Sequence, residues 1–232
     1  MFNELQTLSG GATLFDMSTV QVFIVDDHEL LRSGLRMLLD NEDDLHVCGE
    51  ASDEPTAKRL IREMEPAIVI VDLMLGNGSG LDLIQWLTKS HPTAKSIVST
   101  MHDERIYGER ALRAGASGYV NKKDPARTIL TAIRRVLDGK LFFSEELTSH
   151  IVRRTMTHQT PVDASPFDSL SNRELEVLSL IGQGLTSRQI ALRLHLSPNT
   201  IHTYRERLKT KLDAPSGAEL NRRAIQWVLE NG

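Results

Sequence analysis

The chain has 232 residues, of which 40% are hydrophobic, and a formal net charge of −4. This length exceeds the usual size of one domain and the apolar content suffices for two cores, so we expect two domains. A single cysteine excludes an intrachain disulfide, and no stretch approaches ~20 consecutive apolar residues, which excludes a membrane span and favours the cytoplasm.

The charge is divided unevenly along the chain. Residues 1–169 carry 18 Lys and Arg against 25 Asp and Glu, whereas residues 170–232 carry 9 against 6. A polyanionic partner should therefore meet the C-terminal third. Residues 1–19 have neither the basic start nor the apolar centre of a signal peptide, and we expect them to form a disordered leader.

Strands and helices are predicted to alternate five times through residues 20–142. Runs rich in β-branched residues predict strands at 21–25, 45–49, 67–72, 95–100 and 118–120. Helical periodicity follows them at 28–40, 54–65, 80–90, 104–114 and 125–138. This alternation predicts an α/β fold, a doubly wound five-stranded parallel sheet with helices on both faces.

Acidic residues stand where two of these strands end. Asp26 and Asp27 follow the first strand, and Asp72 closes the third. Because the carboxyl ends of parallel strands share one edge of the sheet, the three carboxylates should lie together and favour Mg²⁺. A carboxylate nucleophile at Asp72 could accept a phosphoryl group while the cation neutralises the transferring oxygens.

Two more strand ends contribute polar residues, whereas the second strand contributes none. Thr100 ends the fourth strand and Lys122 follows the fifth, where both could bind the transferred phosphoryl group. We expect His28 to begin a helix, because no His or Cys stands at metal-ligand spacing from it. The glycine-rich stretch 75–80 lacks the pattern of a phosphate-binding loop and predicts a flexible connection.

The strand-end motifs resemble the receiver domain of bacterial two-component response regulators. They are Val-Asp-Asp-His at 25–28, Val-Asp-Leu at 71–73, Ser-Thr-Met-His-Asp at 99–103 and Ala-Gly-Ala-Ser-Gly-Tyr-Val-Asn-Lys at 114–122. Two departures are Gly76, where the family usually has proline, and Met101, where many receivers have alanine.

The resemblance implies a role for each strand-end residue. It makes Asp72 the phosphoacceptor, Thr100 the switch hydroxyl, Lys122 the phosphoryl-binding lysine and Tyr119 the aromatic that moves on activation. It also implies that Asp26, Asp27, Asp72 and the backbone carbonyl of Met74 hold Mg²⁺. A phosphotransferase of the haloacid dehalogenase type is the enzyme alternative. Those enzymes share a second aspartate two positions after the nucleophile, where this chain has Met74. We therefore expect that the chain is not an enzyme.

From residue 170 onward the sequence predicts helices only. Segments near 171–182, 186–194, 198–212 and 217–229 predict a small all-α domain of four helices, joined to the first domain by a connecting helix and linker at 143–169. Ser171 and Glu174 form a capping-box pattern, and Ser197 with Pro198 begins the third helix. The short joint between the second and third helices has helix-turn-helix spacing.

The third of these helices carries the predicted DNA contacts. Four cations within seven residues suit phosphate contact along a groove, and the helix N-terminus offers backbone donors to a phosphate. The predicted contact residues are Ser197, Asn199, Thr200, His202, Thr203, Arg205, Glu206, Arg207, Lys209 and Lys211. Glu206 could accept a hydrogen bond from a cytosine amino group or pair with a neighbouring cation, and both readings stay open.

Three motifs of this domain resemble a LuxR-type helix-turn-helix. They are Leu-Ser-Asn-Arg-Glu-Leu-Glu-Val-Leu at 170–178, Gly-Leu-Thr-Ser-Arg-Gln-Ile-Ala at 184–191 and Leu-Ser-Pro-Asn-Thr-Ile at 196–201. A receiver followed by this module is the architecture of NarL/FixJ response regulators. The resemblance implies a sensor histidine kinase and double-stranded DNA as partners, a homodimer on activation with help from helix 217–229, and control of transcription. A protein-binding or RNA-binding role for the last domain is the alternative.

Overall fold

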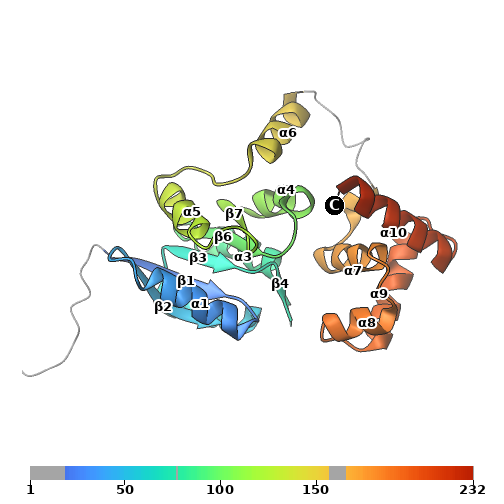
Figure 1. Ribbon diagram of the computed structural model, residues 1–232, viewed down its shortest axis with the longest axis horizontal. Helices are drawn as coiled ribbons and strands as arrows, with labels where there is room; N and C mark the ends of the chain where they lie inside the picture. The colour runs from blue at the N-terminus through green and yellow to red at the C-terminus, as the bar shows by residue number, and fades with distance from the viewer. Residues whose placement is uncertain (1–18, 77, 157–165, 232) are drawn as a thin grey trace, which may run out of the picture.

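A computed structural model describes residues 19–76, 78–156 and 166–231. They form an α/β domain and a smaller all-helical domain that lie side by side (Figure 1). The expected leader lies almost wholly outside the described residues, as does most of the expected linker, so the limits of these two segments stay predictions.

The α/β domain is built on a sheet of five parallel strands in the order β2-β1-β3-β6-β7. The strands are β1 Val20–Val25, β2 Leu45–Ala51, β3 Ile68–Val71, β6 Lys95–Thr100 and β7 Gly118–Asn121. The helices between them are α1 Glu29–Leu39, α2 Glu54–Met64, α3 Gly80–Ser90, α4 Glu104–Ala114 and α5 Thr128–Leu137. The predicted doubly wound sheet is confirmed, and β1 and β3 end next to each other where the strand order reverses.

Both faces of the sheet are covered, because alternate strand residues serve two separate cores. On one face, side chains such as Phe23, Val69 and Val98 pack against α2, α3 and α4. On the other, Ile24 and Ile70 pack against α1 and α5. A parallel sheet buried on both faces explains why the strands read as continuous apolar runs in the sequence.

The connection after β3 differs from the flexible loop that its glycines predict. Met74–Leu75 (β4) and Gly78–Ser79 (β5) form a two-stranded antiparallel hairpin. The backbone N–H of Gly76 donates to Asp27 Oδ2 at 3.0 Å, and that of Ser79 donates to Glu54 Oε2 at 3.3 Å. Two carboxylates from neighbouring segments therefore hold the hairpin in place; residue 77 lies outside the described residues.

The second domain contains the four predicted helices, α7 Asn172–Gly182, α8 Ser187–Arg193, α9 Pro198–Lys211 and α10 Gly217–Asn231, after a short 3₁₀ turn, Pro166–Ser169. Ser171 and Glu174 form the predicted capping box, and Ser197 accepts a hydrogen bond from the Thr200 N–H. Helix α6, Glu145–Met156, packs against α4 and is the predicted connecting helix. Within the described ranges, each helix is too short or too polar to cross a membrane.

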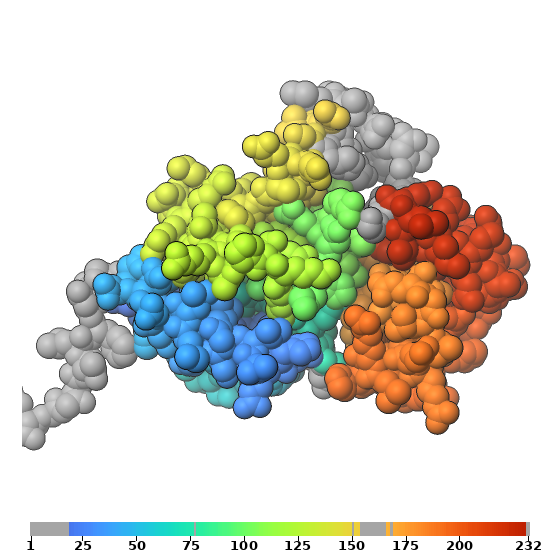
Figure 2. Space-filling model, viewed as in Figure 1, coloured from blue at the N-terminus to red at the C-terminus, as the bar shows by residue number. Residues whose placement is uncertain are grey.

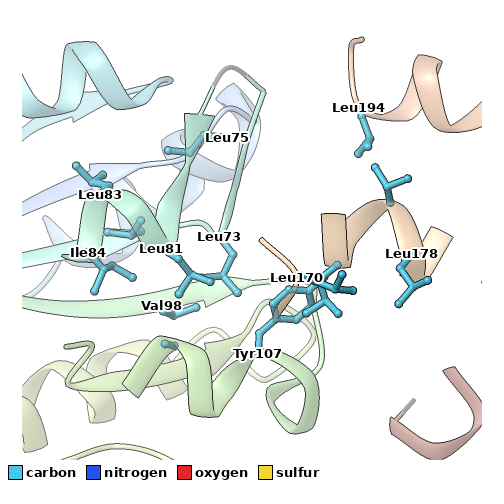
Figure 3. Packing of buried hydrophobic residues seen from close by; sticks show 14 of the residues in the cluster. Leu73, Leu75, Leu81, Leu83, Ile84, Val98, Tyr107, Leu170, Leu178 and Leu194 are labelled. Atoms are coloured by element: carbon cyan, nitrogen blue, oxygen red, sulfur yellow. The ribbon is translucent and has the colours of Figure 1, made fainter. Parts of the chain in front are cut away.

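Helix α7 lies between the two domains (Figure 1). Residues 174–181 are all buried, because α9 and α10 cover one side of the helix and the α/β domain covers the other. Leu170 packs beside Tyr107 of α4 (Figure 3), and Arg110 donates to the carbonyls of Leu170 at 2.8 Å and Phe167 at 2.9 Å. The surfaces of the two domains touch along this side (Figure 2).

Candidate functional site at the sheet edge and on helix α9

Asp26, Asp27 and Asp72 lie together at the carboxyl edge of the sheet, where the sequence predicts them. One oxygen from each carboxylate and Nδ1 of His28 all lie within 4.8 Å of one another. Asp27 Oδ1 is buried and forms no hydrogen bond of ordinary geometry, and His28 Nδ1 lies 2.8 Å from it. Oxygen donors with an unused buried lone pair fit a hard divalent cation. His28 is the N-cap residue of α1, as expected, yet it also borders this cluster.

Lys122 balances part of the negative charge. Its Nζ lies 2.6 Å from both Asp26 Oδ2 and Asp72 Oδ2, and its side chain is only 8% exposed. Burial alone would lower the pKa of Lys122, but Asp72 and Asp26 outweigh it and raise that pKa. Burial raises the pKa of Asp72, and Lys122 offsets this only in part. The structure thus brings together the predicted lysine and the predicted nucleophile.

Thr100 and Tyr119 lie on the same side of the sheet edge. Thr100 is fully buried and close enough to Asp72 to lower its pKa, although its hydroxyl forms no hydrogen bond of ordinary geometry. Tyr119 is buried and its hydroxyl donates to the backbone carbonyl of His102 at 3.0 Å. Met74 donates its N–H to Asp72 Oδ1 at 3.3 Å. The three carboxylates, Lys122 and Thr100 therefore gather at one place, whereas Tyr119 directs its hydroxyl to the His102 carbonyl and Met74 contacts Asp72 through its N–H.

Two residues that sequence reasoning missed support the acidic pair. Arg32 on α1 donates to the backbone carbonyl of Asp26 at 2.6 Å, and its Nε lies 3.5 Å from Glu50 Oε2. Glu50 belongs to β2, so the second strand does contribute, through Arg32, to the sheet edge. A periodic pattern shows that Arg32 is on a helix; it does not show which backbone atom the guanidinium reaches.

Helix α9 carries the predicted DNA contacts on an exposed face. His202, Thr203, Glu206 and Arg207 are exposed, as are Ser197 and Asn199 at the helix start. The hydroxyl of Thr203 donates to the Asn199 carbonyl at 3.1 Å, within the helix itself. The docked arrangement of the two domains therefore leaves these side chains open to solvent.

The four cations of α9 are not equivalent. Arg205 donates to Asn221 at 2.9 Å, Lys209 pairs with Glu206 at 2.7 Å, and Lys211 pairs with the buried Glu174 at 2.7 Å. Arg207 lies over the ring of Tyr204 with its guanidinium 6.0 Å from the centroid. The pairing with Lys209 is one of the two readings of Glu206, and the cytosine contact is the other.

Comparison with known proteins identifies both domains. The model of the response regulator receiver domain matches residues 22–134, and that of the luxR family of bacterial regulatory proteins matches residues 168–224. The chain is 35% identical over 214 residues to the oxygen regulatory protein NreC of Staphylococcus haemolyticus, covering 90% of this chain and 99% of that protein. The chain belongs to the LuxR-type two-component response regulators.

Further relatives support the same family. The response regulator GacA of Pseudomonas viridiflava is 33% identical over 207 residues, covering 89% of this chain and 96% of that protein. The crystal structure of a LuxR-family response regulator from Aurantimonas sp. matches with a TM-score of 0.55 at 32% identity, covering 60% of this chain and 99% of that one. By its family, the 232-residue chain is a transcription regulator and not an enzyme. The receiver interpretation is therefore confirmed, and the dehalogenase-type alternative is excluded.

Proposed function

We propose that a sensor histidine kinase phosphorylates Asp72 and that this modification switches sequence-specific DNA binding by α9. The supporting observation is that Lys122 contacts both Asp72 and Asp26 at 2.6 Å in a cluster of three carboxylates. A structural ion pair needs one carboxylate, whereas phosphoryl transfer needs a nucleophile, a metal site and a cation for the transferred group.

Each residue of the cluster has a part in the transfer. An oxygen of Asp72 attacks phosphorus, and the bond between phosphorus and the donor histidine nitrogen breaks. Asp26, Asp27, Asp72 and the Met74 carbonyl would hold Mg²⁺, and the bound ion would neutralise charge on the phosphoryl oxygens. Lys122 and Thr100 bind the phosphoryl oxygens of the product, and Tyr119 repacks as Thr100 turns toward them.

The output is duplex DNA binding in the cytoplasm by a homodimer. The polar face of α9 and the cap at Ser197 to Thr200 contact the major groove and its phosphates. Helix α10 contributes to pairing of two DNA-binding domains, which then occupy half-sites about one helical turn apart. The exposed polar face of α9 supports this reading over a protein-binding role.

Intact-mass measurement after incubation with Mg²⁺ and a small phosphoryl donor tests the proposal. Wild type should gain one phosphoryl group and Asp72→Asn none. Asp43→Asn is the matched control, because Asp43 lies in the turn before β2 at the opposite edge of the sheet and should label like wild type. Persistent labelling of Asp72→Asn would contradict the assignment. Selection from a randomised duplex DNA pool should become more sequence-specific on phosphorylation. Binding to the selected duplex should weaken as salt rises, and single-stranded RNA should not bind.

A further inference from the structure

The backbone N–H of Gly76 contacts the acidic cluster at the sheet edge. It donates to Asp27 Oδ2 at 3.0 Å, across 49 residues of sequence. Gly76 stands where receivers usually have proline, and proline has no backbone N–H. This departure from the family pattern therefore gives one of the predicted metal ligands a hydrogen bond that the usual residue could not form.

The two oxygens of the Asp27 carboxylate have different surroundings. Oδ2 accepts the Gly76 N–H, whereas Oδ1 is buried and forms no hydrogen bond of ordinary geometry. The terminal torsion of an aspartate side chain is broad, so a bond to one oxygen restricts rotation of the whole carboxylate. The Gly76 N–H therefore fixes the direction in which Oδ1 presents its lone pairs to the cluster.

The same hydrogen bond joins two segments that bring predicted metal ligands to the site. Asp27 follows β1, whereas Met74, whose carbonyl is a predicted ligand, lies two residues before Gly76 in the hairpin. The Met74 N–H donates to Asp72 Oδ1 at 3.3 Å, so the hairpin is tied to the cluster at both Met74 and Gly76. Contacts within the protein thus set the relative positions of ligands from the two segments.

We propose that Gly76 is a positioning residue for the divalent cation and that its N–H makes the site selective for Mg²⁺ over Ca²⁺. The inference rests on the Mg²⁺ site of the proposed function. Mg²⁺ requires nearly ideal octahedral geometry at about 2.0–2.1 Å, whereas Ca²⁺ accepts irregular shells at about 2.3–2.6 Å. Ligands held in fixed positions meet the stricter demand of Mg²⁺, whereas a freely turning carboxylate serves Ca²⁺ equally well.

Two substitutions at Gly76 separate the N–H from the rest of the residue. Gly76→Pro removes the N–H. Gly76→Ala keeps it and is the matched control, because its added Cβ would lie 3.3 Å from Asp27 Oδ2, a contact that a shift of a few tenths of an ångström relieves. A difference between the two variants therefore reports the hydrogen bond and not the presence of a side chain.

Titration calorimetry of the full chain with Mg²⁺ and, separately, with Ca²⁺ tests the inference. Gly76→Pro should bind Mg²⁺ about tenfold more weakly, as expected for loss of one hydrogen bond to a charged group, and Ca²⁺ within about twofold of wild type. Gly76→Ala should keep both affinities within about twofold. Wild-type Mg²⁺ affinity in Gly76→Pro overturns the inference. Equal weakening of both ions does so too, because it indicates a general loosening of the sheet edge.

A measurement on the wild-type chain decides the matter even if Gly76→Pro fails to fold. Coupling between two equilibria is reciprocal, so a hydrogen bond that strengthens Mg²⁺ binding must be strengthened by Mg²⁺ to the same extent. Hydrogen exchange of the Gly76 amide should therefore slow about tenfold in Mg²⁺ and less in Ca²⁺. The Gly115 amide, which donates to the Leu112 carbonyl at the end of α4, is the control and should exchange equally in both. Unchanged exchange at Gly76 overturns the inference.

Intact mass of the wild-type chain distinguishes this inference from the proposed function. The sample is incubated with Mg²⁺ and a small phosphoryl donor, as before. Phosphoryl uptake together with equal responses of Gly76 exchange to Mg²⁺ and Ca²⁺ refutes only the role of Gly76. Normal Mg²⁺ binding without phosphoryl uptake refutes the proposed function.

Discussion

The sheet edge and helix α9 both gather charged side chains, but they hold them differently. At the sheet edge Lys122 is buried between two carboxylates, and its position is fixed because either charge alone would be costly to bury. On α9 the cations lie at the surface and three of them are engaged by Asn221, Glu206 and Glu174. Chemistry at one point requires charged groups held in fixed positions, as at the sheet edge. The cations of a DNA-binding surface can exchange their neighbouring partners for phosphates of the DNA.

Loss of Lys122 should produce the largest effect. Lys122→Ala leaves Asp26 and Asp72 buried without their cation, which costs about 3–5 kcal/mol of unfolding free energy. Urea denaturation in EDTA at neutral pH measures this. Lys123→Ala removes the next, exposed lysine and should stay within about 0.5 kcal/mol of wild type. Equal effects of the two substitutions would show that the edge is not a fixed charge cluster.

The cost of losing Lys122 should also depend on pH. Without the lysine, burial raises the pKa of Asp72 with less opposition, so below neutrality the folded variant binds more protons than the unfolded chain. Its unfolding free energy then rises as the pH falls toward the raised pKa, and the gap to wild type narrows. A gap that stays constant or widens on acidification contradicts this account.

Gly80→Ala tests how closely the backbone is packed at the same edge. The added Cβ would overlap the Asp72 carbonyl, so we expect a loss of about 1–3 kcal/mol and reduced phosphoryl uptake as Asp72 is displaced. Gly34→Ala on α1 is the control, because its Cβ would meet open space. It should gain up to about 1 kcal/mol from helix propensity. Urea denaturation measures the change in unfolding free energy, and intact mass measures the change in phosphoryl uptake.

Lys211→Ala should have a smaller effect on folding. Burial would raise the pKa of Glu174, but hydrogen bonds from Lys211 and Ser171 hold it below its usual value. Because Lys211 is 38% exposed and partly screened, we expect a loss of about 1 kcal/mol. The wild-type advantage is present above the ordinary carboxyl pKa of about 4.3 and disappears as the pH falls through the lower folded pKa. An unchanged stability profile with weakened DNA binding would make Lys211 purely a DNA contact.

Arg207→Ala should affect DNA binding and leave stability unchanged. Its guanidinium lies over Tyr204 at the surface, so it is available to a phosphate. We expect weaker binding to all duplex sequences alike and a slope of log affinity against log salt smaller by about 1. Arg113→Ala removes a similarly exposed arginine of α4 and should leave the slope unchanged. A change in preferred sequence would instead assign Arg207 to a base.

The sequence predicts the positions of Asp26, Asp27, Asp72 and Lys122 because parallel strands bring their carboxyl ends to one edge whatever the loops do. It does not predict Arg32, whose contact depends on how α1 packs, or the bonds of Arg110 to the carbonyls of Phe167 and Leu170, which depend on how the two domains dock. The sequence also does not predict the hairpin after β3. Its glycines indicate a flexible backbone, whereas the hydrogen bonds that restrain it are accepted by Asp27 and Glu54, which are distant in the sequence.

Arg110 suggests how the two domains can be exchanged in evolution. Its two shorter hydrogen bonds go to main-chain carbonyls at Phe167 and Leu170, which every residue type possesses. These bonds depend on the backbone path of the chain that enters the second domain and hardly on the side chains there. A different output domain that begins with the same turn could be fused after α6 and accept the same two hydrogen bonds from Arg110. This arginine therefore favours recombination of domains over a single matched pair.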